Sequence, residues 1–124
     1  MRIHRAECKA ETTASLDFVD VTDEVRTAIA GSGVRQGQVT VFSLESGCSV
    51  VMNERESGLM SDVRAALDRL GAQDVHSRHA LIGSTSVVLP VADGELRLGK
   101  WQRVLLAELE EPGVRSIVIQ VVGE

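Results

Sequence analysis

Two segments of the chain carry apolar residues at the spacing of an amphipathic helix. In residues 57–70 the apolar side chains recur every three or four positions and charged side chains fall between them, as expected of a helix with one buried face. Residues 23–30 show a shorter pattern of the same kind, preceded by Thr22, whose hydroxyl is typical of a helix cap. We therefore predict two helices. The glycines predicted to end them are Gly31 or Gly33 for the first helix and Gly71 for the second.

Most of the remaining apolar residues lie in short runs rich in β-branched side chains, which are typical of strands. The polar segment 45–48 separates two such runs and predicts a turn or tight corner between them, with a hairpin-like pair favoured. Asp93-Gly94 predicts a tight turn within a C-terminal β-meander. Short connections favour antiparallel pairing. The expected fold class is therefore α+β, a mostly antiparallel β-sheet packed with two helices. The predicted strands cover residues 2–8, 16–21, 39–44, 49–53, 85–91, 95–98, 101–109 and 115–122.

The last predicted strand differs from the others because residues 117–122 are apolar on both alternating faces. In an antiparallel sheet of so short a chain, helices can cover one face, and a partner subunit is the simplest cover for the other. No internal repeat, low-complexity run or linker interrupts the 124 residues. Residues 1–124 are therefore expected to form a single domain.

Composition and charge narrow the classes of function. Hydrophobic residues make up 44% and charged residues 25% of the chain, values typical of a folded domain. Aromatic residues make up only 2% and the net charge is -5, which disfavours stacking on bases, binding to phosphate backbones and binding to anionic membranes. Since the N-terminus also lacks a signal-peptide pattern, we expect a cytoplasmic protein that binds neither nucleic acid nor membrane.

The two cysteines are expected to be small buried residues. Cys8 and Cys48 lack a Cys-x-x-Cys spacing, and a reducing compartment disfavours a disulfide between them. A nucleophilic role for Cys48 is the alternative, but neither a Gly-x-Ser-x-Gly elbow nor a histidine lies near it in sequence.

His76 and His79 are the one close pair of histidines. In a helical turn their spacing would place both on one face, where a metal would need a further ligand such as Glu45, Glu54 or Asp62. Histidines in a loop are more often solvated surface residues. The spacing alone therefore favours surface residues over a metal site.

Trp101 opens a predicted strand and is followed by Gln102 and Arg103. A lone tryptophan in this position favours a packing role. The alternative is that Trp101, with the neighbouring amide and guanidinium, lines a pocket for a planar ligand.

The most specific run of motifs lies near the C-terminus, where a Leu-Pro-Val strand, an Asp-Gly turn and a Leu-Gly-Lys-Trp-Gln box follow one another. This order resembles the YjbQ-type proteins, a family described as secondary thiamine-phosphate synthases. The resemblance extends over nearly the whole chain. The similar segments are 81–91, 93–96, 98–102 and 115–124, with 18–22, 37–42 and Asn53-Glu54 upstream.

The resemblance implies an α+β fold that assembles as a homotrimer. It also implies a cleft for a phosphorylated small molecule or a divalent cation such as Mg²⁺ or Zn²⁺. Carried over residue by residue, the implied metal ligands are Glu45 and His76. The implied catalytic residues are Glu45, His76 and Asp62, and the implied substrate-binding residues are Asn53, Glu54, Trp101 and Gln102.

The chain departs from the family at the histidines. The family motif His-Thr-Thr-Ala-Ser is replaced by Glu45-Ser46-Gly47-Cys48-Ser49, so the first histidine becomes Glu45 or is lost. The second has no counterpart because segment 71–75 is shorter, and the third falls on His76. One imidazole with carboxylates binds zinc poorly and magnesium loosely.

Two functions follow from this comparison. The first is an enzyme that joins a pyrimidine diphosphate to a thiazole phosphate, with a cation offsetting the charge of the leaving pyrophosphate. The second is a protein whose catalytic set has eroded and which is retained as an oligomeric ligand- or metal-binding protein.

Overall fold

The computed structural model describes residues 1–124 and contains three helices and eight strands. The helices are α1 (Thr22–Ser32), α2 (Ser57–Arg69) and α3 (Val75–Leu81). The strands are β1 (Arg2–Glu11), β2 (Phe18–Asp20), β3 (Gln36–Ser43), β4 (Cys48–Asn53), β5 (Ser86–Ala92), β6 (Glu95–Leu96), β7 (Arg103–Glu108) and β8 (Val114–Gly123).

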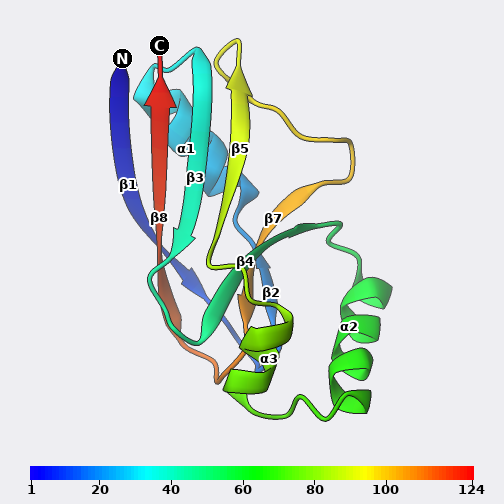
Figure 1. Cartoon of the computed structure of the whole chain (residues 1–124). Helices are drawn as coiled ribbons and strands as arrows, with labels where there is room; N and C mark the ends of the chain where they lie inside the picture. The colour runs from blue at the N-terminus through cyan, green and yellow to red at the C-terminus, as the bar shows by residue number, and fades with distance from the viewer.

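The strands form two antiparallel sheets. The larger has the order β1-β8-β3-β5-β6 and the smaller the order β2-β7-β4, and every pairing is antiparallel. Figure 1 shows β8 between β1 and β3, with α2 and α3 together at the lower end of the molecule. The α+β class with mostly antiparallel pairing is therefore confirmed, with three helices where two were predicted. None of the three helices combines the length and hydrophobicity that a membrane span requires.

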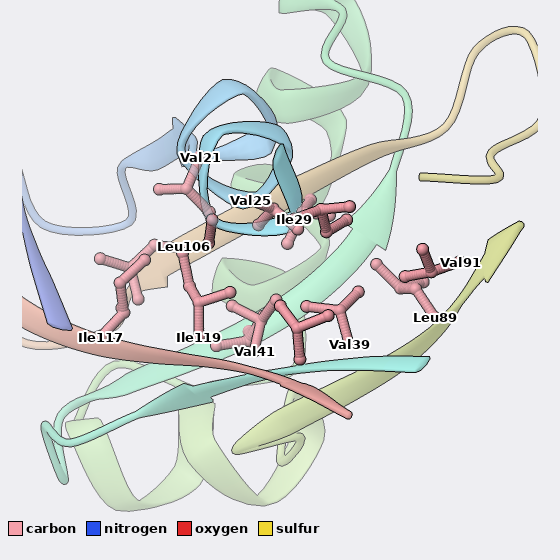
Figure 2. Close-up of a cluster of buried hydrophobic side chains, with 14 of the residues drawn as sticks. Val21, Val25, Ile29, Val39, Val41, Leu89, Val91, Leu106, Ile117 and Ile119 are labelled. Carbon is pink, nitrogen blue, oxygen red and sulfur yellow. The ribbon is translucent and has the colours of Figure 1, made fainter. Parts of the chain in front are cut away.

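The main core lies between α1, the larger sheet and one face of β7. Val25 and Ile29 of α1 pack against Val39 of β3 and Ile119 of β8, and Leu106 of β7 joins them (Figure 2). A second cluster forms on the opposite face of β7, under α2. Because β7 has a core on both faces, its apolar residues run without alternation.

The hairpin-like pairing favoured for residues 39–44 and 49–53 is wrong, whereas the predicted corner between these two strands is present. β3 pairs with β5 and β8, whereas β4 pairs with β7 in the other sheet. The turn at 44–47 carries the chain from one sheet to the other. Val41 of β3 and Val50 of β4 therefore belong to different sheets but pack in the same core. Two apolar strands joined by a short turn fit this corner as well as they fit a hairpin.

The predicted β-meander is also wrong. Only β5 and β6 form the expected hairpin, with Asp93 and Gly94 at φ 56° and 78°, as a type I′ turn requires. After β6 the chain leaves the larger sheet, β7 enters the smaller one, and β8 returns between β1 and β3. The strand predicted from residue 101 begins at Arg103, because residues 97–102 form a loop.

The helix boundaries agree with the predicted glycines but not with the predicted cap. Gly33 and Gly71 lie in the left-handed region, with φ 71° and 72°, just after α1 and α2. Thr22 is the first residue of α1 and caps nothing. Its hydroxyl instead accepts a hydrogen bond from the backbone N–H of Val104 at 2.9 Å and so ties α1 to β7.

The outer face of the larger sheet, opposite α1, has no covering layer within the chain. Ile3, Phe42 and Val88 point to this side and are 66%, 40% and 56% exposed. The inward residues of β8 are buried, whereas outward Val118 and Val122 are half-buried. The two apolar faces predicted for the last strand are therefore present.

Candidate functional site

Most of the predicted site residues lie in two separate surface hollows or in the loops that support them, and Asp62 lies apart on α2. The first, which we call the histidine hollow, has a volume of about 480 Å³. It lies where the turn at 44–47, helix α3 and the turn after β7 meet. Its lining residues are Ser46, Gly47, Val75, His76, His79, Ala80 and Glu110.

His76 and His79 both lie in α3, at the spacing that places them on one face. His76 is exposed and His79 is half-buried. The Nε2 atom of His79 lies 3.3 Å from the backbone oxygen of Cys48, which orients its imidazole against the start of β4. The side chain of His76 is the one free to meet a molecule in the hollow.

The predicted metal ligands do not fit a metal ion in this arrangement. Glu45 does not line the histidine hollow, and its carboxylate accepts a hydrogen bond from the backbone N–H of Ser116 at 3.0 Å. Asp62 is exposed on α2 and lines neither hollow. No group of three histidine, cysteine, aspartate or glutamate side chains is placed to hold a metal ion. Glu45, His76 and Asp62 are thus not brought together.

The second, which we call the tryptophan hollow, has a volume of about 360 Å³. It joins two of the predicted substrate-binding residues, Glu54 and Trp101. Its lining residues are Asp20, Glu54, Arg55, Glu56, Lys100, Trp101 and Arg103.

The favoured packing role for Trp101 is wrong, because 64% of its surface is exposed. The loop at 97–102 stands outside both sheets, so the indole has no core to enter. The ammonium nitrogen of Lys100 lies 5.1 Å from the ring centroid, within the range of a cation–π contact.

The charges around the tryptophan hollow are only partly neutralised. Arg103 Nε donates to Asp20 Oδ2 at 2.6 Å, and a second nitrogen of Arg103 lies 3.9 Å from Asp23. Burial by itself would raise the pKa of Asp20, but hydrogen bonds from Arg103 and Thr22 outweigh it and hold this pKa below its ordinary value. Arg55 and Lys100 form no ion pair within the chain.

Asn53 and Gln102 support the loops of this hollow without lining it. Asn53 Oδ1 accepts from the backbone N–H of Glu54 at 2.8 Å, at the end of β4. Gln102 Oε1 accepts from the backbone N–H of Gly99 at 2.7 Å and fixes the turn that presents Lys100 and Trp101.

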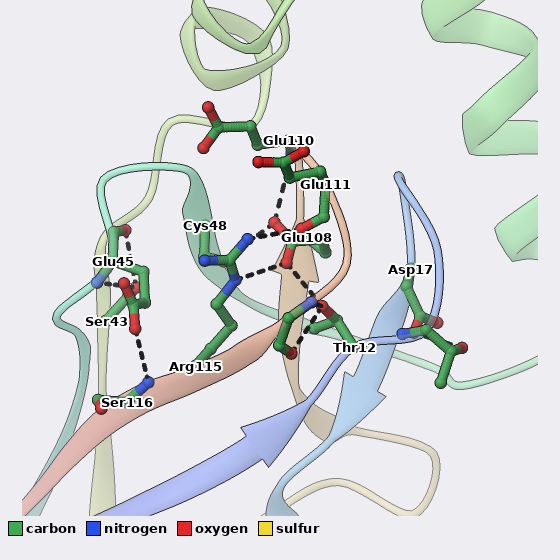
Figure 3. Close-up of polar contacts among 12 residues, drawn as sticks. Thr12, Asp17, Ser43, Glu45, Cys48, Glu108, Glu110, Glu111, Arg115 and Ser116 are labelled. Carbon is green, nitrogen blue, oxygen red and sulfur yellow. Dashed lines mark hydrogen bonds and ion pairs between the residues drawn. The ribbon is translucent and has the colours of Figure 1, made fainter.

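A buried polar cluster behind the histidine hollow was not predicted (Figure 3). The fully buried carboxylate of Glu108 accepts from Thr12 Oγ1 at 2.6 Å and from Arg115 Nε at 2.7 Å on one oxygen. Its other oxygen accepts from Cys48 Sγ at 3.4 Å and from the backbone N–H of Glu110 at 3.3 Å. The signal in the sequence is the alternation of β7, which places Glu108 on the same inward side as Val104 and Leu106.

In this cluster Glu108 is ionised and the thiol of Cys48 stays protonated at neutral pH. Burial would raise the pKa of Glu108, but the hydrogen bonds from Thr12, Arg115, Glu110 and Cys48 outweigh it, so its pKa lies below the ordinary value. Burial, reinforced by the Glu108 charge, raises the pKa of Cys48 to about 12. Cys48 is therefore a neutral core thiol, as predicted, and it forms no disulfide with Cys8.

Comparisons with known proteins agree with the fold. A family model described as "UPF0047 protein YjbQ-like" matches residues 6–124. A UPF0047 protein of Methanothermobacter thermautotrophicus is 31% identical over 137 residues, covering 100% of this chain and 95% of the relative. Another, of Archaeoglobus fulgidus, is 30% identical over 127 residues, covering 92% and 98%.

Solved structures give the same result. A YbjQ-like protein of unknown function from Sulfolobus solfataricus superposes with a TM-score of 0.90 at 27% identity, over 99% of both chains. A hypothetical protein from Aeropyrum pernix superposes with a TM-score of 0.85 at 28% identity, over 97% of this chain and 98% of the other. The chain therefore belongs to the UPF0047 family of YjbQ-like proteins.

Proposed function

We propose that this protein binds a phosphorylated planar small molecule in the tryptophan hollow, and that its catalytic set is incomplete. The observation that carries the proposal is the exposed indole of Trp101 beside two cations, Arg55 and Lys100. Neither cation has a carboxylate partner in the chain. An exposed indole offers a flat surface for an aromatic ring. The guanidinium and ammonium groups suit the oxygens of a phosphate.

Two of the three acidic side chains of this hollow, those of Asp20 and Glu56, have hydrogen-bond partners other than the two cations. Asp20 is held by Arg103 at 2.6 Å, and Glu56 accepts hydrogen bonds from the backbone N–H groups of Gly58 and Leu59 at the start of α2. Glu54 remains as the free carboxylate. It would select against a second phosphate on that side of the ligand or accept a hydrogen bond from a ring substituent.

The second candidate function is the joining of a pyrimidine diphosphate to a thiazole phosphate. It is supported by the same hollow, because a pyrimidine diphosphate is planar at one end and anionic at the other. Glu45, His76 and Asp62 lie outside the hollow that would hold the substrate, so this reaction would have to proceed without contact between them and the substrate. A magnesium ion would enter with the diphosphate, since Mg²⁺ commonly binds through substrate phosphates with few protein carboxylates.

A third element of the proposal is assembly as a homotrimer. The uncovered outer face of the larger sheet, with exposed Ile3, Phe42 and Val88, supports association between copies, and the number of three comes from the family resemblance. A second copy of the chain is the simplest cover for such a face.

The binding proposal can be tested by titrating the protein with the pyrimidine diphosphate while monitoring fluorescence. Trp101 is the only tryptophan and the chain has no tyrosine, so the signal comes from the hollow itself. We expect saturable binding, weakened by about tenfold or more in Trp101→Ala because stacking is lost, and retained in Trp101→Phe. Calorimetry would supply the affinities of both variants.

Adding the thiazole phosphate and Mg²⁺ separates the two functions. Binding without thiamine phosphate detectable by mass spectrometry supports a binding protein, and product that requires Trp101 supports the transferase. An unchanged affinity in Trp101→Ala would refute the site for either function.

A further inference from the structure

Lys100 lies over the indole of Trp101, and both residues line the tryptophan hollow. Its ammonium lies 5.1 Å from the centroid of the Trp101 ring, and it has no carboxylate partner. Arg55 and Arg103 line the same hollow but make no such contact with the ring. Without a ligand, the cation nearest the indole is therefore Lys100.

We propose that Lys100 makes the hollow specific for phosphorylated ligands. Its ammonium leaves the Trp101 ring and contacts the phosphate when such a ligand binds. The inference rests on the proposed function of the tryptophan hollow. A cation–π contact at an exposed site is weak, whereas a phosphate offers the ammonium full negative charge and several acceptor oxygens. An arriving phosphate therefore draws Lys100 away from the indole and uncovers the ring face for the planar part of the ligand.

Because of this exchange, binding of the planar part of the ligand depends on the presence of its phosphate. A planar molecule without a phosphate has to displace the ammonium and gives it nothing in return. A phosphorylated planar molecule satisfies both the ammonium and the indole. The hollow then discriminates against uncharged planar molecules more strongly than a fixed cation would.

Arg55 provides the matched comparison, because it is a cation of the same hollow without a contact to the ring. Replacing either residue with methionine removes one positive charge and keeps a long side chain. Only Lys100→Met also removes the group that covers Trp101. Both residues are exposed, so neither substitution threatens the core.

The test measures the affinities of the pyrimidine diphosphate and of the corresponding pyrimidine alcohol for the native protein, Lys100→Met and Arg55→Met. Both variants should bind the diphosphate about tenfold more weakly. The alcohol should bind about two- to fivefold more tightly to Lys100→Met, since the competing cation–π contact is gone, and with native affinity to Arg55→Met. Lys100→Arg should restore discrimination.

An alcohol affinity that is unchanged or weaker in Lys100→Met would overturn the exchange. If the diphosphate still binds at Trp101 in that case, the proposed function stands without it. If the diphosphate does not bind to the native protein at all, the proposed function and the exchange both fail.

Inorganic pyrophosphate gives a direct readout. It should shift the indole N–H resonance of Trp101 in the native protein and in Arg55→Met, and leave that resonance in place in Lys100→Met. Binding of pyrophosphate without that shift in the native protein would contradict the exchange.

Discussion

Glu108 is an acidic side chain at a position that the alternation of β7 assigns to the core. Its carboxylate is acceptable there because four donors surround it, one of them the guanidinium of Arg115. The donors come from the loop between β1 and β2, from β4, from β8 and from the turn that follows β7. A single side chain thus joins four parts of the chain behind the histidine hollow.

Glu108→Gln should lower the free energy of unfolding by about 3 kcal/mol, because Arg115 loses its charged partner in a mostly buried site. The measurement is urea unfolding at neutral pH. Glu111→Gln is the control, since Glu111 is exposed and only its backbone oxygen contacts Arg115. Equal stabilities of the two variants would show that the buried pair contributes nothing.

The same substitution predicts a change in pH dependence. The pKa of Glu108 is lower in the folded protein than its ordinary value of 4.5, so its contribution is present above that pH and is lost as the pH falls through the folded pKa. The native protein should therefore lose stability below about pH 4.5 more steeply than Glu108→Gln. Parallel acid limbs in the two unfolding profiles would contradict this account.

The residues of the site could be predicted only where they belong to a recognisable sequence motif. Glu54 was predicted from the family resemblance, and Trp101 from that resemblance and from its place beside Gln102 and Arg103; Glu54 and Trp101 do share a hollow. The exposure of Trp101 could not be read from local pattern, because it depends on whether residues 97–102 enter a sheet. Glu108 was missed because its four donors come from segments far apart in sequence.

At the scale of elements, α1 shows how two neighbouring glycines differ in effect. Gly33 lies in the left-handed region at φ 71° and ends the helix. Gly31 lies within α1, and a methyl group there would meet only His4 Nε2, at 3.8 Å.

Gly33→Ala should destabilise the protein by about 1 kcal/mol because a Cβ disfavours this conformation. Gly31→Ala should stabilise it by up to about 1 kcal/mol because alanine is the better helix former. Thermal unfolding of the two variants checks both signs. A loss of stability in Gly31→Ala or a gain in Gly33→Ala would place the end of α1 elsewhere.

The elements themselves were more predictable than their pairing. Helix α2 has its full pattern within one stretch of sequence, so its periodicity predicted it. The partners of β3 and β4 depend on strands more than thirty residues away along the chain, and local composition does not carry that information. Helix α3 was missed because seven mixed residues are too few for a periodic pattern.

At the scale of the whole molecule, the larger sheet has a complete core on one face and none on the other. Cross-strand neighbours on the open face include Phe42 beside Val118 and Thr40 beside Val88. If a second copy covers this face, charges placed on it should separate the copies.

Light scattering should give three times the monomer mass for the native protein, and the monomer mass for Phe42→Glu and Val88→Glu. Leu70→Glu is the control, because Leu70 is 69% exposed but lies at the end of α2, outside the larger sheet. A monomeric native protein would refute the assembly, and dissociation by Leu70→Glu would place the interface elsewhere.

The position of β8 between β1 and β3 has a consequence for synthesis on the ribosome. Until residues 114–123 have emerged, β1 has no hydrogen-bonding neighbour and β3 has only β5. A nascent chain, or one truncated before residue 114, therefore presents open strand edges that invite pairing with other chains. The larger sheet is completed only after translation has passed β8, so premature termination should yield aggregates instead of a smaller folded protein.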